Sequence, residues 1–115
     1  MELEIVFENK EILVVNKPAG LVINRSQTVS GRTLQDEIAK HLGLGDGDLG
    51  VGERAGIVHR LDRETSGLIL IAKSEKTFLN LQEQFKNRKV EKEYVALVHG
   101  QINTEKIDVR NKIFR

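Results

Sequence analysis

Apolar and polar positions near the N-terminus follow a pattern typical of a β-hairpin. Two short, mainly apolar segments, residues 3–7 and 12–16, are separated by four polar residues. Such segments, joined by a short polar connection, predict two paired strands. The sequence Lys17-Pro18-Ala19-Gly20 should end the second strand, because proline lacks an amide donor and glycine favours turns.

A helix is predicted after the polar loop that follows the apolar residues 21–23. Thr33 and Asp36 have the spacing of a capping pair at a helix N-terminus. Leucine and isoleucine then recur at helical spacing between residues 34 and 42, and a glycine follows. The pattern therefore predicts a helix from Thr33 to about residue 42.

Residues 43–56 hold six of the ten glycines of the chain. Glycine loses much conformational entropy on ordering, and the segment offers few apolar anchors, so we expect a mobile loop. A phosphate-binding loop is the alternative. It is the poorer interpretation, because no strong strand precedes the glycines and no Gly-Lys-Ser or Gly-Lys-Thr follows them.

The remainder of the chain predicts a strand, a helix and a second strand. The uninterrupted apolar residues 68–72 are typical of a strand buried on both faces. Ser74 is a suitable N-cap for a helix over residues 75–87, and residues 94–99 alternate well enough for a strand. The apolar stripe of that helix consists of Phe78, Leu81 and Phe85. The order of elements indicates an α/β or α+β fold.

Composition narrows the class of protein. With 115 residues the chain is long enough for one domain, residues 1–115, and the absence of cysteine excludes disulfides and thiolate ligands. Three scattered histidines predict no metal site. No segment has the length and apolarity of a signal peptide or a membrane span, so we expect a soluble, cytoplasmic protein.

The net charge of +1 hides two groups of basic residues. A polyanionic partner needs a local basic surface, so the distribution of charge matters more than its sum. One group precedes the predicted strand 68–72 and the other precedes the predicted strand 94–99. They consist of Arg54, His59, Arg60 and Arg63, and of Lys86, Arg88, Lys89 and Lys92.

Candidate chemistry lies in the first of these groups. Asp62 stands between Arg60 and Arg63, and nearby positive charge favours the ionised form of a carboxyl group. Asp62 is therefore a candidate nucleophile or base at the start of a buried strand. The alternative is a surface network of ion pairs, followed by a turn at residues 65–67.

Residues 59–73, with the sequence HRLDRETSGLILIAK, resemble the signature of the RluA-type pseudouridine synthases, which isomerise uridine in structured RNA. Two further segments look like motifs of this family: ILVVNKPAGL at residues 12–21 and KEYVALVHG at residues 92–100. The three motifs occur in the order of the family and at about its spacing.

The resemblance implies an α+β fold with a mixed, mainly antiparallel sheet and flanking helices. It also implies an RNA partner, ribosomal or transfer RNA, and neither a metal nor an organic cofactor. The family has a later motif similar to Gly-Arg-Thr-His-Gln-x-Arg that does not occur in this order before Arg115. We therefore expect the chain to match the N-terminal half of a truncated catalytic domain, with sheet edges open to self-association.

The resemblance also assigns individual residues. Asp62 matches the aspartate that attacks the uridine, at either the ribose or the base. Arg60 matches an arginine that takes the place of the displaced base, with a structural ion pair as the alternative. Tyr94 matches a tyrosine that packs against the target base, with an ordinary core tyrosine as the alternative. The supporting loop residues are His59, Leu61, Arg63, Thr65, Ser66 and Gly67.

Two functions follow from these assignments. In the first, the chain is part of an RNA uridine isomerase with Asp62 as its nucleophile. In the second, it is a non-catalytic RNA-binding or interaction module that retains part of the fold. An isomerisation assay on uridine-containing RNA separates them.

Overall fold

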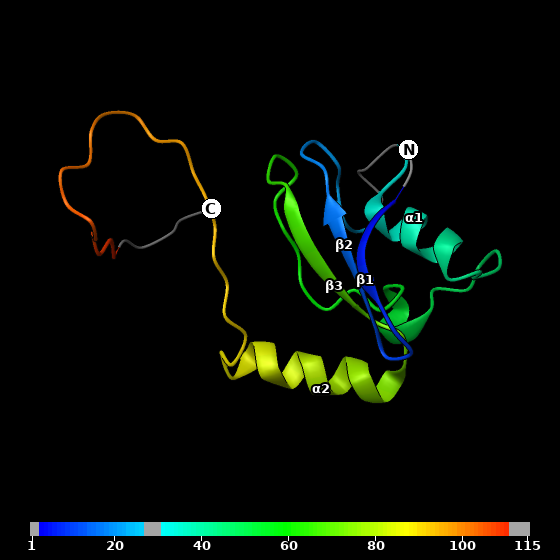
Figure 1. Ribbon diagram of the computed structural model, residues 1–115. Coiled ribbons are helices and arrows are strands. Elements are labelled where there is room, and N and C mark those ends of the chain that lie inside the picture. Colours follow the sequence, from blue (N-terminus) through cyan, green and yellow to red (C-terminus); the bar gives the residue numbers. More distant parts are fainter. Residues whose placement is uncertain (1–2, 27–30, 111–115) are drawn as a thin grey trace.

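A three-stranded antiparallel sheet forms the centre of the structure (Figure 1). The computed structural model describes residues 3–26 and 31–110. The strands lie in the order β1-β2-β3 and comprise β1 (Glu4–Glu8), β2 (Ile12–Lys17) and β3 (Gly67–Ala72). The predicted hairpin and the predicted strand at 68–72 are confirmed, with boundaries that differ by one residue.

The turn of the hairpin is held by Asn9. Its side-chain oxygen accepts hydrogen bonds from the backbone N–H groups of Glu11 and Ile12 at 2.8 and 2.9 Å. Asparagine commonly closes turns in this way. The pairing of β1 with β2 shifts between Ile5 and Phe7, so Val6 sits at a β-bulge.

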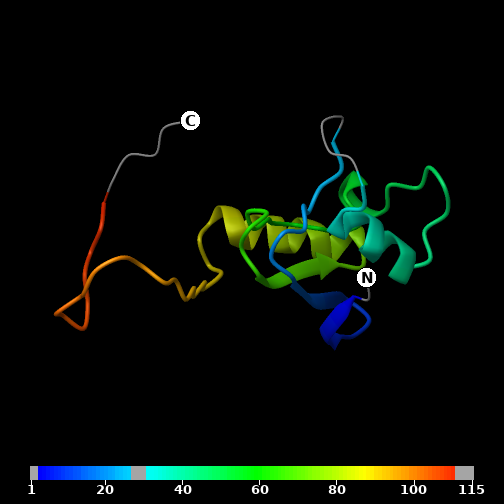
Figure 2. The same ribbon diagram turned by 90° about the horizontal axis from the view of Figure 1, so that it is seen from above.

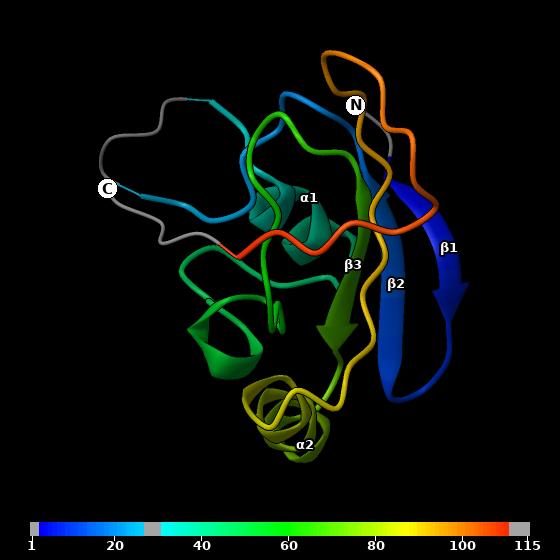
Figure 3. The same ribbon diagram turned by 90° about the vertical axis from the view of Figure 1, so that its left-hand side faces the viewer.

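Helix α1 (Leu34–His41) begins at the predicted capping pair. The Asp36 N–H donates to the Thr33 hydroxyl at 3.3 Å, and the Thr33 N–H donates to the Asp36 carboxylate at 2.9 Å. The helix covers one face of the sheet (Figure 3). The core between them contains Leu13, Val15, Ile69 and Ile71 from the strands and Leu34, Ile38 and Ala39 from the helix. Of the predicted polar loop that precedes α1, residues 27–30 lie outside the described residues.

Strand β3 is buried on one face only, which corrects the expectation of burial on both. Ile69 and Ile71 are fully buried, whereas the Leu68 side chain on the opposite face is 57% exposed. Leu68 and Leu70 pair with Asn16 and Val14 of β2, so these four residues share the second face. No helix of the described residues covers that face as α1 covers the first. The run of apolar residues does not show burial on both faces, because the apolar Leu68 lies on the uncovered face.

The glycine-rich segment contains a 3-10 turn, η1 (Val51–Glu53), and the buried Ala55. Its last residues pass along the outer edge of β3, where the Ala72 N–H donates to the Gly56 carbonyl at 2.8 Å and Ile57 bridges Ile71. The segment is thus anchored at its C-terminal end. The mobility of residues 43–56 stays a prediction.

Ser74 is the N-cap of helix α2 (Glu75–Lys86), as predicted. The Ser74 hydroxyl accepts a hydrogen bond from the Thr77 N–H at 3.2 Å, which satisfies one of the free amides of the first turn. Phe78 is the buried residue of the helix, and its ring lies against Gly52 of η1.

The predicted strand at residues 94–99 does not form. Residues 91–110 contain no helix or strand, are exposed, and lead away from the sheet beyond α2 (Figures 1 and 2). An alternating segment forms a strand only when it pairs with a neighbour, and no backbone hydrogen bond joins residues 91–110 to the sheet in the described structure. Residues 56–59 lie along the outer edge of β3. The described residues keep the predicted α+β class. They include no helix that is long and apolar enough to cross a membrane.

Candidate active site

Asp62 lies at the turn that leads into β3. The Thr65 N–H donates to the Asp62 carbonyl at 3.0 Å, which closes a four-residue turn over residues 62–65. Asp62 itself is exposed, as are Arg60 and Arg63. Neither arginine forms an ion pair with Asp62 in the described structure. The turn lies at residues 62–65 and not at residues 65–67 as predicted, because Gly67 already belongs to β3. No network of ion pairs around Asp62 occurs among the described residues.

The buried ammonium group of Lys17 holds this turn through the Arg63 carbonyl. Lys17 is fully buried, and its Nζ donates to the carbonyl oxygens of Pro18, Leu21 and Arg63 at 3.0, 2.9 and 3.0 Å. The Gly20 N–H also donates to the Arg63 carbonyl. The end of β2 and the Asp62 turn are therefore joined through one side chain and one backbone amide.

The sequence motifs do not indicate this role of Lys17. Leu13, Val15 and Lys17 alternate along β2, so the lysine points to the same buried face as the two apolar residues. Burial lowers the pKa of Lys17 from its usual range, and the nearby Glu64 carboxylate opposes this effect. The alternation was visible in the sequence, but lysine at a strand end usually extends into solvent.

His59 anchors the other end of the loop. Its Nε2 accepts a hydrogen bond from the Leu70 N–H at 2.9 Å, which requires that this nitrogen carry no proton. The ring stacks on Phe85 of α2 with 4.7 Å between centroids, and the Lys92 ammonium lies 5.8 Å from the Phe85 centroid. Burial and then the Lys92 charge lower the pKa of His59, so the neutral ring is favoured.

A cavity of about 500 Å³ opens beside the Asp62 turn. Residues on both sides of Asp62 line it, namely Leu61 before it and Ser66 and Gly67 after it. The second face of the sheet contributes Leu68 and Leu70, and the segment after α2 contributes Tyr94. Tyr94 is 61% exposed, so it is a wall of this cavity and not the core residue of the alternative interpretation.

A second cavity, of about 280 Å³, shares Leu61 with the first. Arg60 and Arg63 line it, together with Arg25 from the loop after β2. The structure thus separates the predicted residues into two groups. Tyr94, Ser66 and Gly67 line the first cavity, the two arginines line the second, and Leu61 belongs to both. Thr65 closes the turn between them. The functional roles assigned to these residues stay predictions.

The described residues offer no group of three or more histidine or carboxylate side chains arranged to hold a metal ion. The chemical groups at the site are a carboxylate, guanidinium groups, a phenol and backbone amides. This set suits a nucleophilic attack on an anionic, aromatic substrate.

Comparison with known proteins identifies the family of this arrangement. The model of a family described as RNA pseudouridylate synthase matches residues 11–115. A similar solved structure is Human RNA Pseudouridylate Synthase Domain Containing 4, with 27% identity and a TM-score of 0.54. The match covers 75% of this chain and 30% of the human chain.

Curated relatives agree. An uncharacterized RNA pseudouridine synthase of Helicobacter pylori is 42% identical over 95% of this chain and 33% of its own length. A ribosomal large subunit pseudouridine synthase D of Zymomonas mobilis is 40% identical over 85% of this chain and 31% of its own. A tRNA pseudouridine synthase C of Haemophilus ducreyi is 38% identical over 89% of this chain and 39% of its own. The chain thus spans about a third of the length of these relatives, and within that span it belongs to the RNA pseudouridylate synthase family.

Proposed function

We propose that this chain supplies the nucleophile and part of the base pocket of an enzyme that isomerises uridine to pseudouridine in ribosomal or transfer RNA. The observation that carries the proposal is the position of Asp62. Its carboxylate is exposed on a turn whose flanking residues line a cavity that also contains Tyr94. Family membership and the names of the relatives support the same reaction.

The proposed reaction rearranges bonds within one nucleotide. The Asp62 carboxylate attacks the uridine, at the ribose or at the base, and the bond between C1′ and N1 breaks. The base turns, C1′ bonds to C5, C5 releases a proton and N1 gains one. The bond that Asp62 formed with the uridine breaks again before the product leaves, which restores the carboxylate. Atoms and electrons balance without an oxidant, a metal or a cofactor.

The neighbouring side chains would hold the nucleotide in place. The Tyr94 ring suits stacking on a pyrimidine that must turn during the reaction. Arg60 is exposed on the same loop. Its guanidinium group would fill the gap that the flipped base leaves in the RNA, because a planar cation can stack on the neighbouring bases. A cytoplasmic location goes with this proposal, because the proposed substrates are cellular RNAs.

The test measures release of tritium from C5-labelled uridine in ribosomal and transfer RNA by the 115-residue chain. We expect release by the wild-type chain, none by Asp62→Asn, and unchanged RNA affinity in that variant. Asp46→Asn, which changes an exposed aspartate in the glycine-rich segment, is the matched control and should retain activity.

Turnover by Asp62→Asn would overturn the assignment of the nucleophile. RNA binding by the wild-type chain without tritium release would favour the alternative function, a non-catalytic RNA-binding module.

A further inference from the structure

The cavity that shares Leu61 with the first cavity has a cationic lining. Three arginines from two segments of the chain, Arg25, Arg60 and Arg63, contribute to it, and none of the described residues that line it is an aspartate or a glutamate. The two segments are the loop after β2 and the Asp62 loop. A concave surface with several guanidinium groups and no carboxylate attracts an anion.

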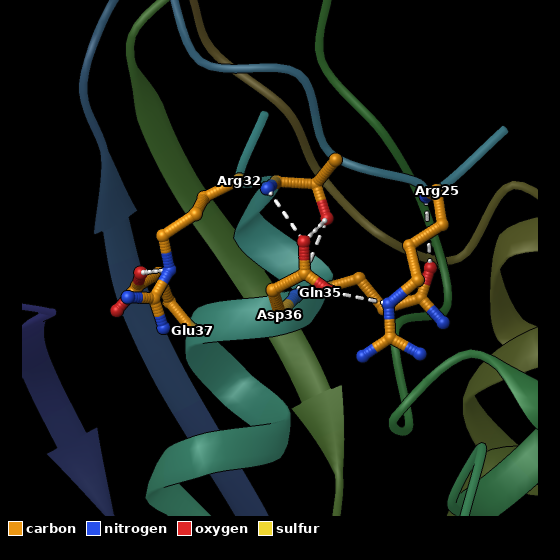
Figure 4. Close-up of polar contacts among 6 residues, drawn as sticks. Arg25, Arg32, Gln35, Asp36 and Glu37 are labelled. Atoms are coloured by element: carbon orange, nitrogen blue, oxygen red, sulfur yellow. Dashed lines mark hydrogen bonds and ion pairs between the residues drawn. The ribbon is translucent and has the colours of Figure 1, made fainter. Parts of the chain in front are cut away.

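Arg25 is held in place for such a role (Figure 4). Its backbone N–H donates to the Gln35 side-chain oxygen at 3.0 Å, and its Nε pairs with the Asp36 carboxylate. Asp36 is itself fixed by Thr33 at the start of α1. The two terminal amino groups of Arg25 point away from Asp36 in Figure 4, and no contact of the described residues uses them. The guanidinium is therefore oriented and retains two donors.

Arg63 is held through its backbone, which leaves its side chain available. The carbonyl group accepts hydrogen bonds from the Lys17 ammonium and the Gly20 N–H. The side chain is exposed and forms no ion pair in the described part of the chain. A substitution of the Arg63 side chain therefore leaves both anchoring hydrogen bonds in place.

The position of this cavity indicates which anion it binds. Leu61 lines both cavities, so the cavity lined by arginines adjoins the pocket proposed for the uridine base. In RNA a phosphate is separated from each base by a single ribose. A base in the first cavity therefore has a backbone phosphate close to it, and the adjoining cavity offers the cationic groups that suit this phosphate.

We propose that Arg25 and Arg63 bind a backbone phosphate of the RNA that flanks the target uridine. Guanidinium groups donate two parallel hydrogen bonds to phosphate oxygens, which would fix the register of the nucleotide at Asp62. The inference rests on the proposed function, because that function places the uridine in the neighbouring cavity.

The test measures binding of a short, single-stranded, uridine-containing RNA to the 115-residue chain at several salt concentrations. Arg25→Gln and Arg63→Gln should each weaken binding about tenfold and reduce the slope of log K against log salt by about 0.7. Arg110→Gln changes an exposed arginine outside this cavity and outside both basic groups, and should leave both quantities unchanged. Circular dichroism should show that all three variants remain folded.

Two modified RNAs identify the phosphate. Each carries one methylphosphonate, on the 5′ or the 3′ side of the uridine, and this group lacks the negative charge of a phosphate. At one of the two positions the wild-type chain should lose affinity, whereas Arg63→Gln should lose none beyond its own defect. The inference would be overturned if the losses from Arg63→Gln and from methylphosphonate were additive at both positions. Equal losses of affinity for Arg110→Gln and Arg63→Gln would also overturn it.

The outcome is separable from that of the tritium assay. Coupling between Arg63 and a phosphate, in a chain that releases no tritium, supports the phosphate site and counts against the proposed reaction. Tritium release without such coupling supports the reaction and overturns the phosphate site.

Discussion

Lys17 joins the first strand pair to the loop that contains Asp62. Its ammonium group is buried below the turn and satisfies three carbonyl oxygens that come from both segments. A buried ammonium group is costly unless it is fully hydrogen-bonded, and this group has the three acceptors that its three protons require. Lys17 is therefore a positioning residue for Asp62, with no contact to substrate required.

Replacement of Lys17 by methionine should destabilise the chain and loosen the Asp62 turn. The side chain keeps a similar length, but the three carbonyl groups lose their common donor, so we expect the free energy of unfolding to fall by about 2 kcal/mol. Urea denaturation measures this change. Hydrogen exchange of the Gly20 amide, which donates to Arg63, should accelerate. Lys76→Met, at an exposed position of α2, should change stability by less than about 0.5 kcal/mol. Equal stabilities of the two variants would contradict the anchoring role.

At this scale the sequence indicated candidate reactive residues, and it did not indicate the contacts that hold their loop in place. Asp62, Arg60 and Tyr94 were recognisable because their types and spacing resemble a known signature. The supporting contacts of Lys17 and His59 join residues 46 and 11 positions apart in the chain. Local spacing carries no information on such contacts. Only the alternation along β2 indicated that Lys17 points inward.

At the scale of elements, the outer edge of β3 is closed by the residues that lead into the Asp62 loop. The Gly56 carbonyl accepts from the Ala72 N–H, and the His59 ring accepts from the Leu70 N–H. These contacts take two of the donors that an additional strand would use. They also place the start of the Asp62 loop beside the strand that follows it.

Gly56 makes this close approach possible, and its replacement by alanine should be strongly destabilising. Its φ of +82° is unfavourable for other residues, and an added Cβ would overlap the Ala72 carbonyl oxygen. We expect thermal or urea denaturation to show a loss of about 3 kcal/mol. Gly45→Ala, at a position with open space and no positive φ, should change stability by less than about 0.5 kcal/mol. Similar small effects at both positions would show that the edge contact is not required.

The elements that the sequence predicted correctly are those with local signals. The capping residues Thr33 and Ser74 and the turn residue Asn9 act within a few positions, and the elements beside them form as expected. The prediction for residues 94–99 was wrong because alternation describes a surface that can pair, and local sequence does not specify the partner strand. The prediction of two buried faces for β3 failed for the same kind of reason, since burial depends on which elements cover the sheet.

At the scale of the whole molecule, the sheet has one covered face and one terminal strand that is exposed along its length. All five residues of β1 are exposed, and the apolar Ile5, Val6 and Phe7 are 41%, 54% and 49% exposed. The bulge at Val6 interrupts the edge but adds no charge to it. Glu8 pairs with Lys73 and His41, which reduces the repulsion between two such edges.

We therefore expect two copies of the chain to associate through β1, in a reversible manner that depends on concentration. Sedimentation velocity should show the dimer fraction rising with protein concentration. Phe7→Lys should shift the equilibrium towards the monomer, because a charge on an open edge opposes strand pairing. Leu79→Lys removes a similarly exposed apolar side chain on α2 and should leave the equilibrium unchanged. An equal effect of both substitutions would indicate unspecific apolar contact, and a monomer at every concentration would contradict pairing at this edge.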